Sequence, residues 1–160
     1  LLGCGTILRE MIAAAEILSK EYNIDSDVWS VTSFNELKRE GSEVERWNRL
    51  NPERKEKVPY VSSLLSKSSN PVIAATDYVK SYPEQIRPFI DQPYTCLGTD
   101  GFGRSDTREN LRSFFEVDKY HIAYAALYAL YKDSRIEKKQ VIKALNKFDI
   151  DQQSKNPSTR

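Results

Sequence analysis

Short apolar runs alternate along the chain with segments whose apolar residues recur at helical spacing. Residues 72–76 form the most continuous apolar run, which is typical of a strand covered on both faces of a sheet. Residues 28–31 and 94–97 are further β-prone runs, and residues 1–5 resemble the end of a buried strand. The alternation predicts an α/β fold, a doubly wound and mainly parallel sheet of about five strands with the 72–76 strand at its centre.

The first amphipathic segment predicts a helix that packs on this sheet. Its buried stripe is formed by Ile7, Met11, Ala14 and Leu18, and it is widened by Leu8, Ile12 and Ala15. A second, more polar helical region follows over residues 33–50. There we expect Trp47 and Leu50 to face inward, and Gly41 is a candidate break in the helix.

The middle of the chain is less regular. Residues 51–70 contain two prolines, a charge-rich run and a serine cluster, so we expect a surface connection with one helical turn near residues 60–65. After the central strand, Asp77 is placed to cap a helix that runs to about Arg87 and ends at Pro88.

The pattern of the last third of the chain predicts helix after helix. Asp106 and Glu109 have the capping-box spacing that begins a helix, and Ser134 and Glu137 repeat this spacing. Asp118 is placed to open a helix between these two. We therefore expect extra C-terminal helices beside the sheet.

Length and charge narrow the classes of protein. The 160 residues suit one domain, for which we expect residues 1–150, followed by a frayed polar tail over residues 151–160. A net charge of +1 from 24 basic and 23 acidic side chains gives no electrostatic attraction to nucleic acid or to an anionic membrane, and we expect neither as a partner.

The two cysteines, Cys4 and Cys96, match neither a zinc-site spacing nor a dense disulfide framework. We interpret them as buried free thiols of a protein in a reducing cytoplasm. The first residues have neither an initiator Met nor the features of a signal peptide, so we expect this chain to be a fragment of something larger.

The glycine-rich loop after residues 94–97 is the candidate site. It consists of Asp100, Gly101, Phe102, Gly103, Arg104, Ser105 and Asp106. The loop lies at the carboxyl end of a predicted strand, where ligands of open parallel sheets usually bind. A catalytic carboxylate pair needs a partner acid or base, and the loop holds no His, Cys or Lys. We therefore expect Asp106 to cap a helix, and Asp100 or Arg104 to pair with a neighbouring domain or another subunit.

Three other features have simpler explanations than chemistry. Gly3 and Gly5 follow an apolar run, but Leu8 occupies the third position of a dinucleotide fingerprint, so a tight turn without a ligand is the preferred interpretation. His121 is the single histidine and has no cysteine cluster or triad motif beside it, so we expect a packed or surface side chain. Four tyrosines follow helical spacing and favour either core packing, the default, or a half-buried interface: Tyr120, Tyr124, Tyr128 and Tyr131.

Several segments together resemble a known enzyme family. They are residues 98–118, residues 26–34, Glu45-Arg46-Trp47-Asn48, Val58-Pro59-Tyr60 and Ala75-Thr76-Asp77-Tyr78. In this order they are similar to the C-terminal domain of the homodimeric, thiamine-diphosphate-dependent pyruvate dehydrogenase component of bacteria. The outline of the loop and the helix after it also resembles a transketolase C-terminal domain. Cys4 stands where that family is expected to have a small polar residue.

The resemblance implies a cytoplasmic parent enzyme that decarboxylates pyruvate and reductively acetylates lipoyl groups on the transacetylase of its complex. In that family, two upstream domains hold thiamine diphosphate and Mg²⁺, through a Gly-Asp-Gly to Asn motif and an activating glutamate. Gly-Asp-Gly is absent from this chain. The resemblance therefore implies no catalytic, cofactor-binding or metal-binding residue here, but a role in assembling the homodimer.

Two alternatives remain open. The chain can be the C-terminal domain of a transketolase or another sugar-transferring enzyme. It can also be a stand-alone module that binds a small ligand or anion through the loops at Gly3 and Gly101.

Overall fold

A four-stranded parallel sheet organises the computed structural model, which describes residues 1–159. The strands are β1 (Leu2–Gly3), β2 (Trp29–Ser30), β3 (Val72–Ala75) and β4 (Tyr94–Leu97), in the order β2-β1-β3-β4. All three pairs are parallel. The parallel α/β fold with the 72–75 strand inside the sheet is confirmed. The sheet has four strands among the described residues, close to the predicted number of about five, and the chain continues into helices after β4.

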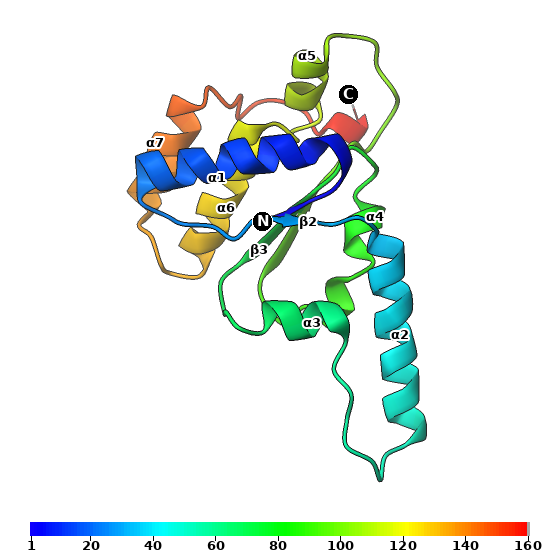
Figure 1. Ribbon diagram of the computed structural model, residues 1–160. Helices are drawn as coiled ribbons and strands as arrows, with labels where there is room; N and C mark the ends of the chain where they lie inside the picture. Colours follow the sequence, from blue (N-terminus) through cyan, green and yellow to red (C-terminus); the bar gives the residue numbers. More distant parts are fainter. Residues whose placement is uncertain (160) are drawn as a thin grey trace.

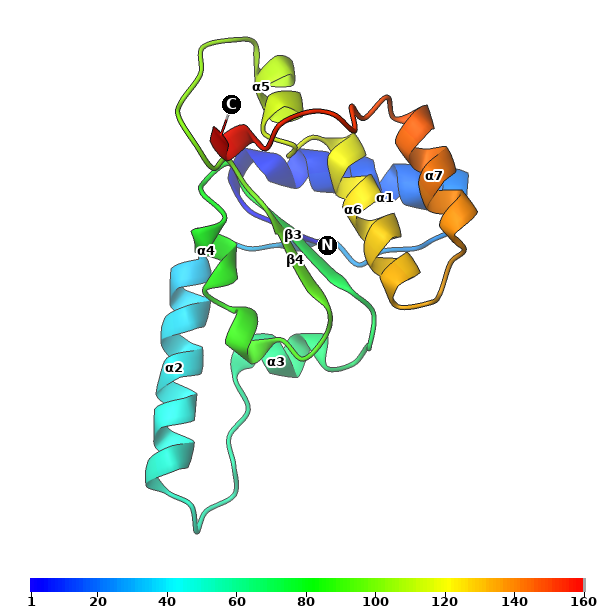
Figure 2. The same cartoon turned by 180° about the vertical axis from the view of Figure 1, so that it is seen from behind.

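Helices cover both faces of the sheet, so the doubly wound arrangement is confirmed (Figures 1 and 2). One face carries α1 (Leu8–Tyr22), α6 (Lys119–Lys132) and α7 (Lys138–Lys147), and its core includes Ile73 and Ala75. The other face carries α2 (Phe34–Leu50), α3 (Tyr60–Leu65) and α4 (Ser81–Glu84), and its core includes Val72 and Ala74. Side chains of a strand alternate between faces, so β3 contributes to two separate cores.

Helix α2 is continuous, and Gly41 does not break it. A Cβ atom at Gly41 would lie 2.6 Å from Cε2 of Phe89, so the glycine makes room for that buried ring. Ser33 caps the helix, since its hydroxyl accepts a hydrogen bond from the backbone N–H of Glu36 at 3.2 Å. The expectation that Leu50 faces inward is wrong, because its side chain is 58% exposed.

The end of α2 and the segment after it project away from the sheet as an arm (Figure 1). We call residues 44–60 the arm. Asn48 holds its two sides together: its side-chain amide donates to the carbonyl of Lys57 at 2.8 Å and accepts from the N–H of Lys57 at 2.9 Å. The Lys57 ammonium lies 4.0 Å from the centre of the Trp47 ring. The arm therefore has an internal structure, although Val58 and Tyr60 are more than half exposed.

Between β3 and β4 the helix is much shorter than predicted. The segment contains α4 and a 3-10 turn, η2 (Arg87–Phe89), with Pro88 inside the turn rather than after a helix. Asp77 does not cap α4; its carboxylate accepts a hydrogen bond from the Thr6 hydroxyl at 3.1 Å. The backbone N–H of Lys80 donates instead to Asp100, at 2.8 Å. Helix α4 therefore has no side-chain cap, and Asp100 holds the residue that precedes it.

Of the two helix starts predicted after residue 117, the one at α6 is confirmed and the one at α7 is wrong. Asp118 caps α6, where its carboxylate accepts from the N–H groups of Tyr120 and His121 at 3.0 and 2.9 Å. The predicted box of Ser134 and Glu137 is wrong. Ser134 ends α6 with a φ of 60°, and the side chain of Gln140 accepts from the N–H of Glu137 at 3.1 Å. The box therefore starts three residues later than the sequence suggested.

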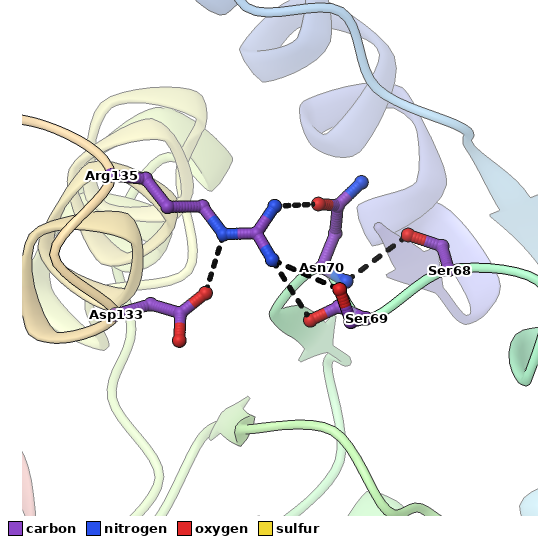
Figure 3. A network of polar contacts seen from close by, with 5 residues as sticks. All are labelled: Ser68, Ser69, Asn70, Asp133 and Arg135. Atoms are coloured by element: carbon purple, nitrogen blue, oxygen red, sulfur yellow. Dashed lines mark hydrogen bonds and ion pairs between the residues drawn. The ribbon is translucent and has the colours of Figure 1, made fainter.

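Arg135, in the turn between α6 and α7, ties that turn to the loop before β3 (Figure 3). Its guanidinium contacts the carboxylate of Asp133 at 2.5 Å, the hydroxyl of Ser69 at 3.0 Å and the side chain of Asn70. Ser68 in turn accepts from the N–H of Asn70 at 3.0 Å. The network fixes the helical pair against the sheet at the end opposite the candidate loop.

The polar tail, which we expected to fray, folds back over the domain (Figure 2). It ends in a 3-10 turn, η3 (Pro157–Thr159), and Pro157 is buried. The Pro157 carbonyl oxygen would lie 2.8 Å from a Cβ atom placed on Gly101. The tail therefore packs directly on the glycine-rich loop.

Candidate functional site

The glycine-rich loop lies where the sequence placed it, at the carboxyl end of β4, and leads into α5 (Arg108–Phe114). Two hydrogen bonds fix its start. The N–H of Thr99 donates to the carbonyl of Tyr78 at 2.9 Å, and Asp100 accepts from Lys80 as described above. The loops after β3 and β4 therefore form one unit.

Asp106 is not the cap of α5. The cap is Thr107, whose hydroxyl accepts from the N–H of Asn110 at 3.3 Å. Asp106 stands one residue earlier, where its carboxylate accepts from the N–H of Thr107 at 2.7 Å and from the side-chain amide of Asn110 at 2.8 Å. The bond from Asn110 lowers the pKa of the Asp106 carboxyl below its usual value. The predicted pairing with Glu109 fails because the following threonine is also a good cap.

This correction gives a stability prediction for the isolated chain. We expect Thr107→Ala to lower the free energy of unfolding by about 0.5–2 kcal/mol, and Thr107→Ser to restore most of the loss. Asp106→Asn keeps an acceptor for the N–H of Thr107 and should change stability less than Thr107→Ala. Urea unfolding of the three variants measures this order, and an equal loss in Thr107→Ser and Thr107→Ala would contradict the cap.

The two glycines in the middle of the loop differ in backbone conformation and in surroundings. Gly101 has a φ of 105° and lies under the tail, whereas Gly103 has open space where a side chain would be. Phe102, between them, is 83% exposed. The guanidinium of Arg104 lies 5.0 Å from the centre of the Phe114 ring. Ser105 is exposed.

Exposed apolar side chains occur on this loop and on the adjoining one. Tyr78 and Val79 in the adjoining loop after β3 are 54% and 44% exposed. Together with Phe102 they form what we call the loop patch. Large apolar side chains exposed on neighbouring loops are typical of a contact surface. No group of three or more His, Cys, Asp or Glu side chains within residues 1–159 is arranged to hold a metal ion.

The other candidates are placed as follows. Cys4 and Cys96 are free thiols as predicted, but only Cys96 is buried and Cys4 is half-buried. Burial raises the pKa of Cys96 to about 12, so this thiol stays protonated. His121 is half-buried, with Nδ1 2.9 Å from the carboxylate of Asp118. The expectation that the four tyrosines of α6 pack in the core fails for two of them, because Tyr120 and Tyr128 are 40% and 47% exposed.

Sequence reasoning missed a cluster of polar groups next to the loop. Thr6 and Asp77 meet across the ends of β1 and β3, and Arg112 on α5 forms an ion pair with Glu10 on α1 at 2.7 Å. Glu10 also accepts from the N–H of Lys119 at 3.0 Å. The spacing of four between arginines at 104, 108 and 112 was the signal that could have drawn attention to this surface.

Comparison with known proteins identifies the domain. The model of the transketolase-like TK C-terminal domain matches residues 1–118. The chain belongs to the transketolase-like C-terminal domain family. It is also 54% identical over 158 residues to the pyruvate dehydrogenase E1 component of Pseudomonas aeruginosa. The corresponding proteins of Cupriavidus necator and Escherichia coli are each 51% identical, over 157 and 158 residues.

These matches cover 98% of this chain but 18% of each relative, so the chain spans about a fifth of the length of the proteins it resembles. They also reach further than the family model. An alignment of 158 residues includes most of α6, α7 and the tail, which lie beyond residue 118. In the part of the chain that the structure describes, no helix is long and apolar enough to cross a membrane.

Proposed function

We propose that this chain is the C-terminal assembly domain of a thiamine-diphosphate-dependent pyruvate dehydrogenase E1 component. The parent enzyme would decarboxylate pyruvate and reductively acetylate lipoyl groups on the transacetylase of its complex. The observation that carries the proposal is the identity of 51–54% to E1 components over nearly the whole chain. This similarity extends through the C-terminal helices, which the general transketolase-like model does not include, and so favours the pyruvate enzyme over a sugar-transferring one.

The residues of this domain do not fit the cofactor. Thiamine diphosphate with Mg²⁺ needs a set of oxygen ligands for the metal ion, and residues 1–159 offer no cluster of three acidic or other metal-binding side chains. We place the cofactor in other parts of the parent and assign no chemical step to this chain. The parent is proposed as a cytoplasmic protein, which the two free cysteines support.

The proposed role of the domain is to support a homodimer. Three observations favour a contact surface at the carboxyl end of the sheet: the exposed loop patch, the bonds between its two loops, and the tail that buttresses Gly101. The projecting arm offers a second apolar surface, where Leu50, Val58 and Tyr60 are more than half exposed. Apolar side chains of this kind are stabilising when a partner covers them.

The first test addresses the parent. The complete reading frame that contains this chain should encode an enzyme that releases CO₂ from pyruvate and acetylates a lipoyl domain, and both reactions should require thiamine diphosphate and Mg²⁺. The isolated chain should neither consume pyruvate nor show Mg²⁺-dependent binding of thiamine diphosphate by calorimetry. A parent that moves two-carbon units between sugar phosphates would replace this proposal with the transketolase alternative.

The second test addresses assembly. In the parent we expect Phe102→Ala to weaken the dimer by about tenfold, which corresponds to the loss of one buried aromatic contact. Activity lost at low protein concentration should return at high concentration, because mass action restores the dimer. Thermal unfolding of the isolated chain should not change, since Phe102 is 83% exposed there. Ile142→Ala, at a 50% exposed position on α7, is the matched control; an unchanged dimer in Phe102→Ala would remove this residue from the interface.

A further inference from the structure

A cleft lies between the carboxyl edge of the sheet and α5. Its volume is about 460 Å³, within the range of pockets that hold small molecules. The strand order β2-β1-β3-β4 means that the chain winds in one direction from β1 and in the other direction from β3. In open parallel sheets this reversal leaves a crevice outside the carboxyl ends of the two strands, and ligands bind there. The cleft contains Thr6, which follows β1, and Asp77, which follows β3.

The polar groups on the sheet side of the cleft are held in place. Asp77 accepts from the hydroxyl of Thr6 at 3.1 Å, while its backbone carbonyl accepts from the hydroxyl of Thr99 at 2.9 Å. Gly5 has a φ of 59°, and a Cβ atom there would lie 2.9 Å from the Asp77 carboxylate. Because Gly5 has no side chain, the Asp77 carboxylate can lie close to the turn without a steric clash. These groups are positioned before any ligand arrives, which lowers the entropic cost of binding.

The opposite side of the cleft is cationic. It is lined by arginines from the loop and α5, at spacings of four: Arg104, Arg108 and Arg112. Arg112 is neutralised by Glu10, but Arg108 forms no ion pair with any residue in the described range. A guanidinium binds a carboxylate or phosphate group through two parallel hydrogen bonds. Apolar side chains also line the cleft: Ile7, Leu111, Phe115 and Val117.

We propose that this cleft binds a small organic anion that carries a phosphate or carboxylate group and a hydroxyl group. Arg108, with Arg104 beside it, holds the anionic group, and the Asp77 carboxylate accepts from the hydroxyl. The apolar lining contacts the carbon skeleton of the ligand. This proposal rests on the geometry of the cleft and does not depend on the identity of the parent enzyme.

The test is a titration of the 160-residue chain with glycerol 3-phosphate, malate and inorganic phosphate. Calorimetry gives the affinity, and amide chemical shifts locate the site. We expect saturable binding of at least one of the two organic anions, with shifts at Thr6, Asp77 and Thr99. A response to glycerol 3-phosphate alone assigns a phosphate site, and a response to malate alone assigns a carboxylate site.

Two substitutions test the roles of the cleft residues. Arg108→Gln should weaken binding by about tenfold, because a charge-assisted hydrogen-bonded contact is lost. Arg54→Gln, on the arm and 68% exposed, removes the same charge far from the cleft and should leave the affinity unchanged. Asp77→Asn should strengthen the binding of inorganic phosphate, since it removes the negative charge from the cleft but keeps an acceptor for Thr6.

Three results would overturn the proposal. The first is the absence of saturable binding at millimolar concentrations, in a chain whose amide spectrum is that of the folded domain. The second is an equal loss of affinity in Arg108→Gln and Arg54→Gln. The third is a set of amide shifts confined to residues outside the cleft. None of them bears on whether the parent decarboxylates pyruvate, so failure here and failure of the proposed function are separate outcomes.

Discussion

Ile73→Asp should abolish the folded state of the domain. Ile73 is 1% exposed and lies in the core between β3 and the helices α1 and α6. Removal of a buried aliphatic side chain costs about 2–5 kcal/mol, and burial of an unpaired polar group costs about 2–7 kcal/mol more. Their sum is comparable with the whole stability of a domain of this size. Circular dichroism and size-exclusion chromatography should show an unfolded or aggregated chain.

The matched control for this substitution is Ile12→Asp. Ile12 belongs to α1, which packs on the same face of the sheet, but its own side chain is 47% exposed. The new carboxylate can therefore remain in water, and we expect a folded chain with a loss of about 1 kcal/mol or less. A folded Ile73→Asp chain with an unchanged melting temperature would contradict the burial of β3 against α1 and α6.

The central fold could be predicted because its signals are strong and local. The run at 72–75 is apolar at each position, which is the pattern of a parallel strand buried on both faces. The stripe of Met11, Ala14 and Leu18 is fully buried as its spacing indicated. The expectation that Ile12 widens the buried face is wrong, because its side chain is 47% exposed. Asp118 also fulfils its prediction, because an isolated capping residue before an apolar helix has few competitors.

The wrong predictions concern side chains for which more than one interaction partner was available. Asp77 was a plausible helix cap, but the folded chain brings Thr6 to it from a position 71 residues away. Asp106 lost the capping position to the adjacent Thr107, and Ser134 lost it to Glu137 three residues later. Gly41 looked like a helix break until the Phe89 ring was placed against it. The outcomes at Asp77 and Gly41 depend on tertiary contacts, about which local spacing contains no information. The outcomes at Asp106 and Ser134 were decided between neighbouring residues that are all acceptable caps.

One part of the candidate site could also be predicted from local sequence, and another part could not. The loop at residues 100–106 was found from its glycines and its position after a strand, and both are local properties. The cleft beside it combines residues after β1, β3 and β4 with residues of α5, so it exists only once the strand order is known. The order β2-β1-β3-β4 decides which strand ends meet, and the sequence pattern did not specify it.

Gly101→Val and Gly103→Val should differ sharply, although the two residues are separated only by Phe102. Gly101 has a φ of 105°, and a Cβ atom there would approach the Pro157 carbonyl oxygen to 2.8 Å. A β-branched residue is strained in this conformation, and we expect a loss of about 1–3 kcal/mol in the free energy of unfolding. Gly103 has no atom within 4 Å of its Cβ position. Gly103→Val should therefore stay within about 0.5 kcal/mol of the unaltered chain.

A second measurement separates strain in the loop from displacement of the tail. In Gly101→Val the valine pushes against Pro157 and Ser158, so the tail should detach and become sensitive to proteases at residues 151–159. Gly101→Ala keeps the unfavourable φ but adds fewer atoms, so its loss should lie between those of glycine and valine. The tail of Gly103→Val should stay as protected as that of the unaltered chain. The positive φ and the contact with the tail are the two reasons why valine should destabilise the chain more at Gly101 than at Gly103. Equal losses of stability in the two variants, with equal protection of the tail, would show that the tail does not pack on Gly101 in solution.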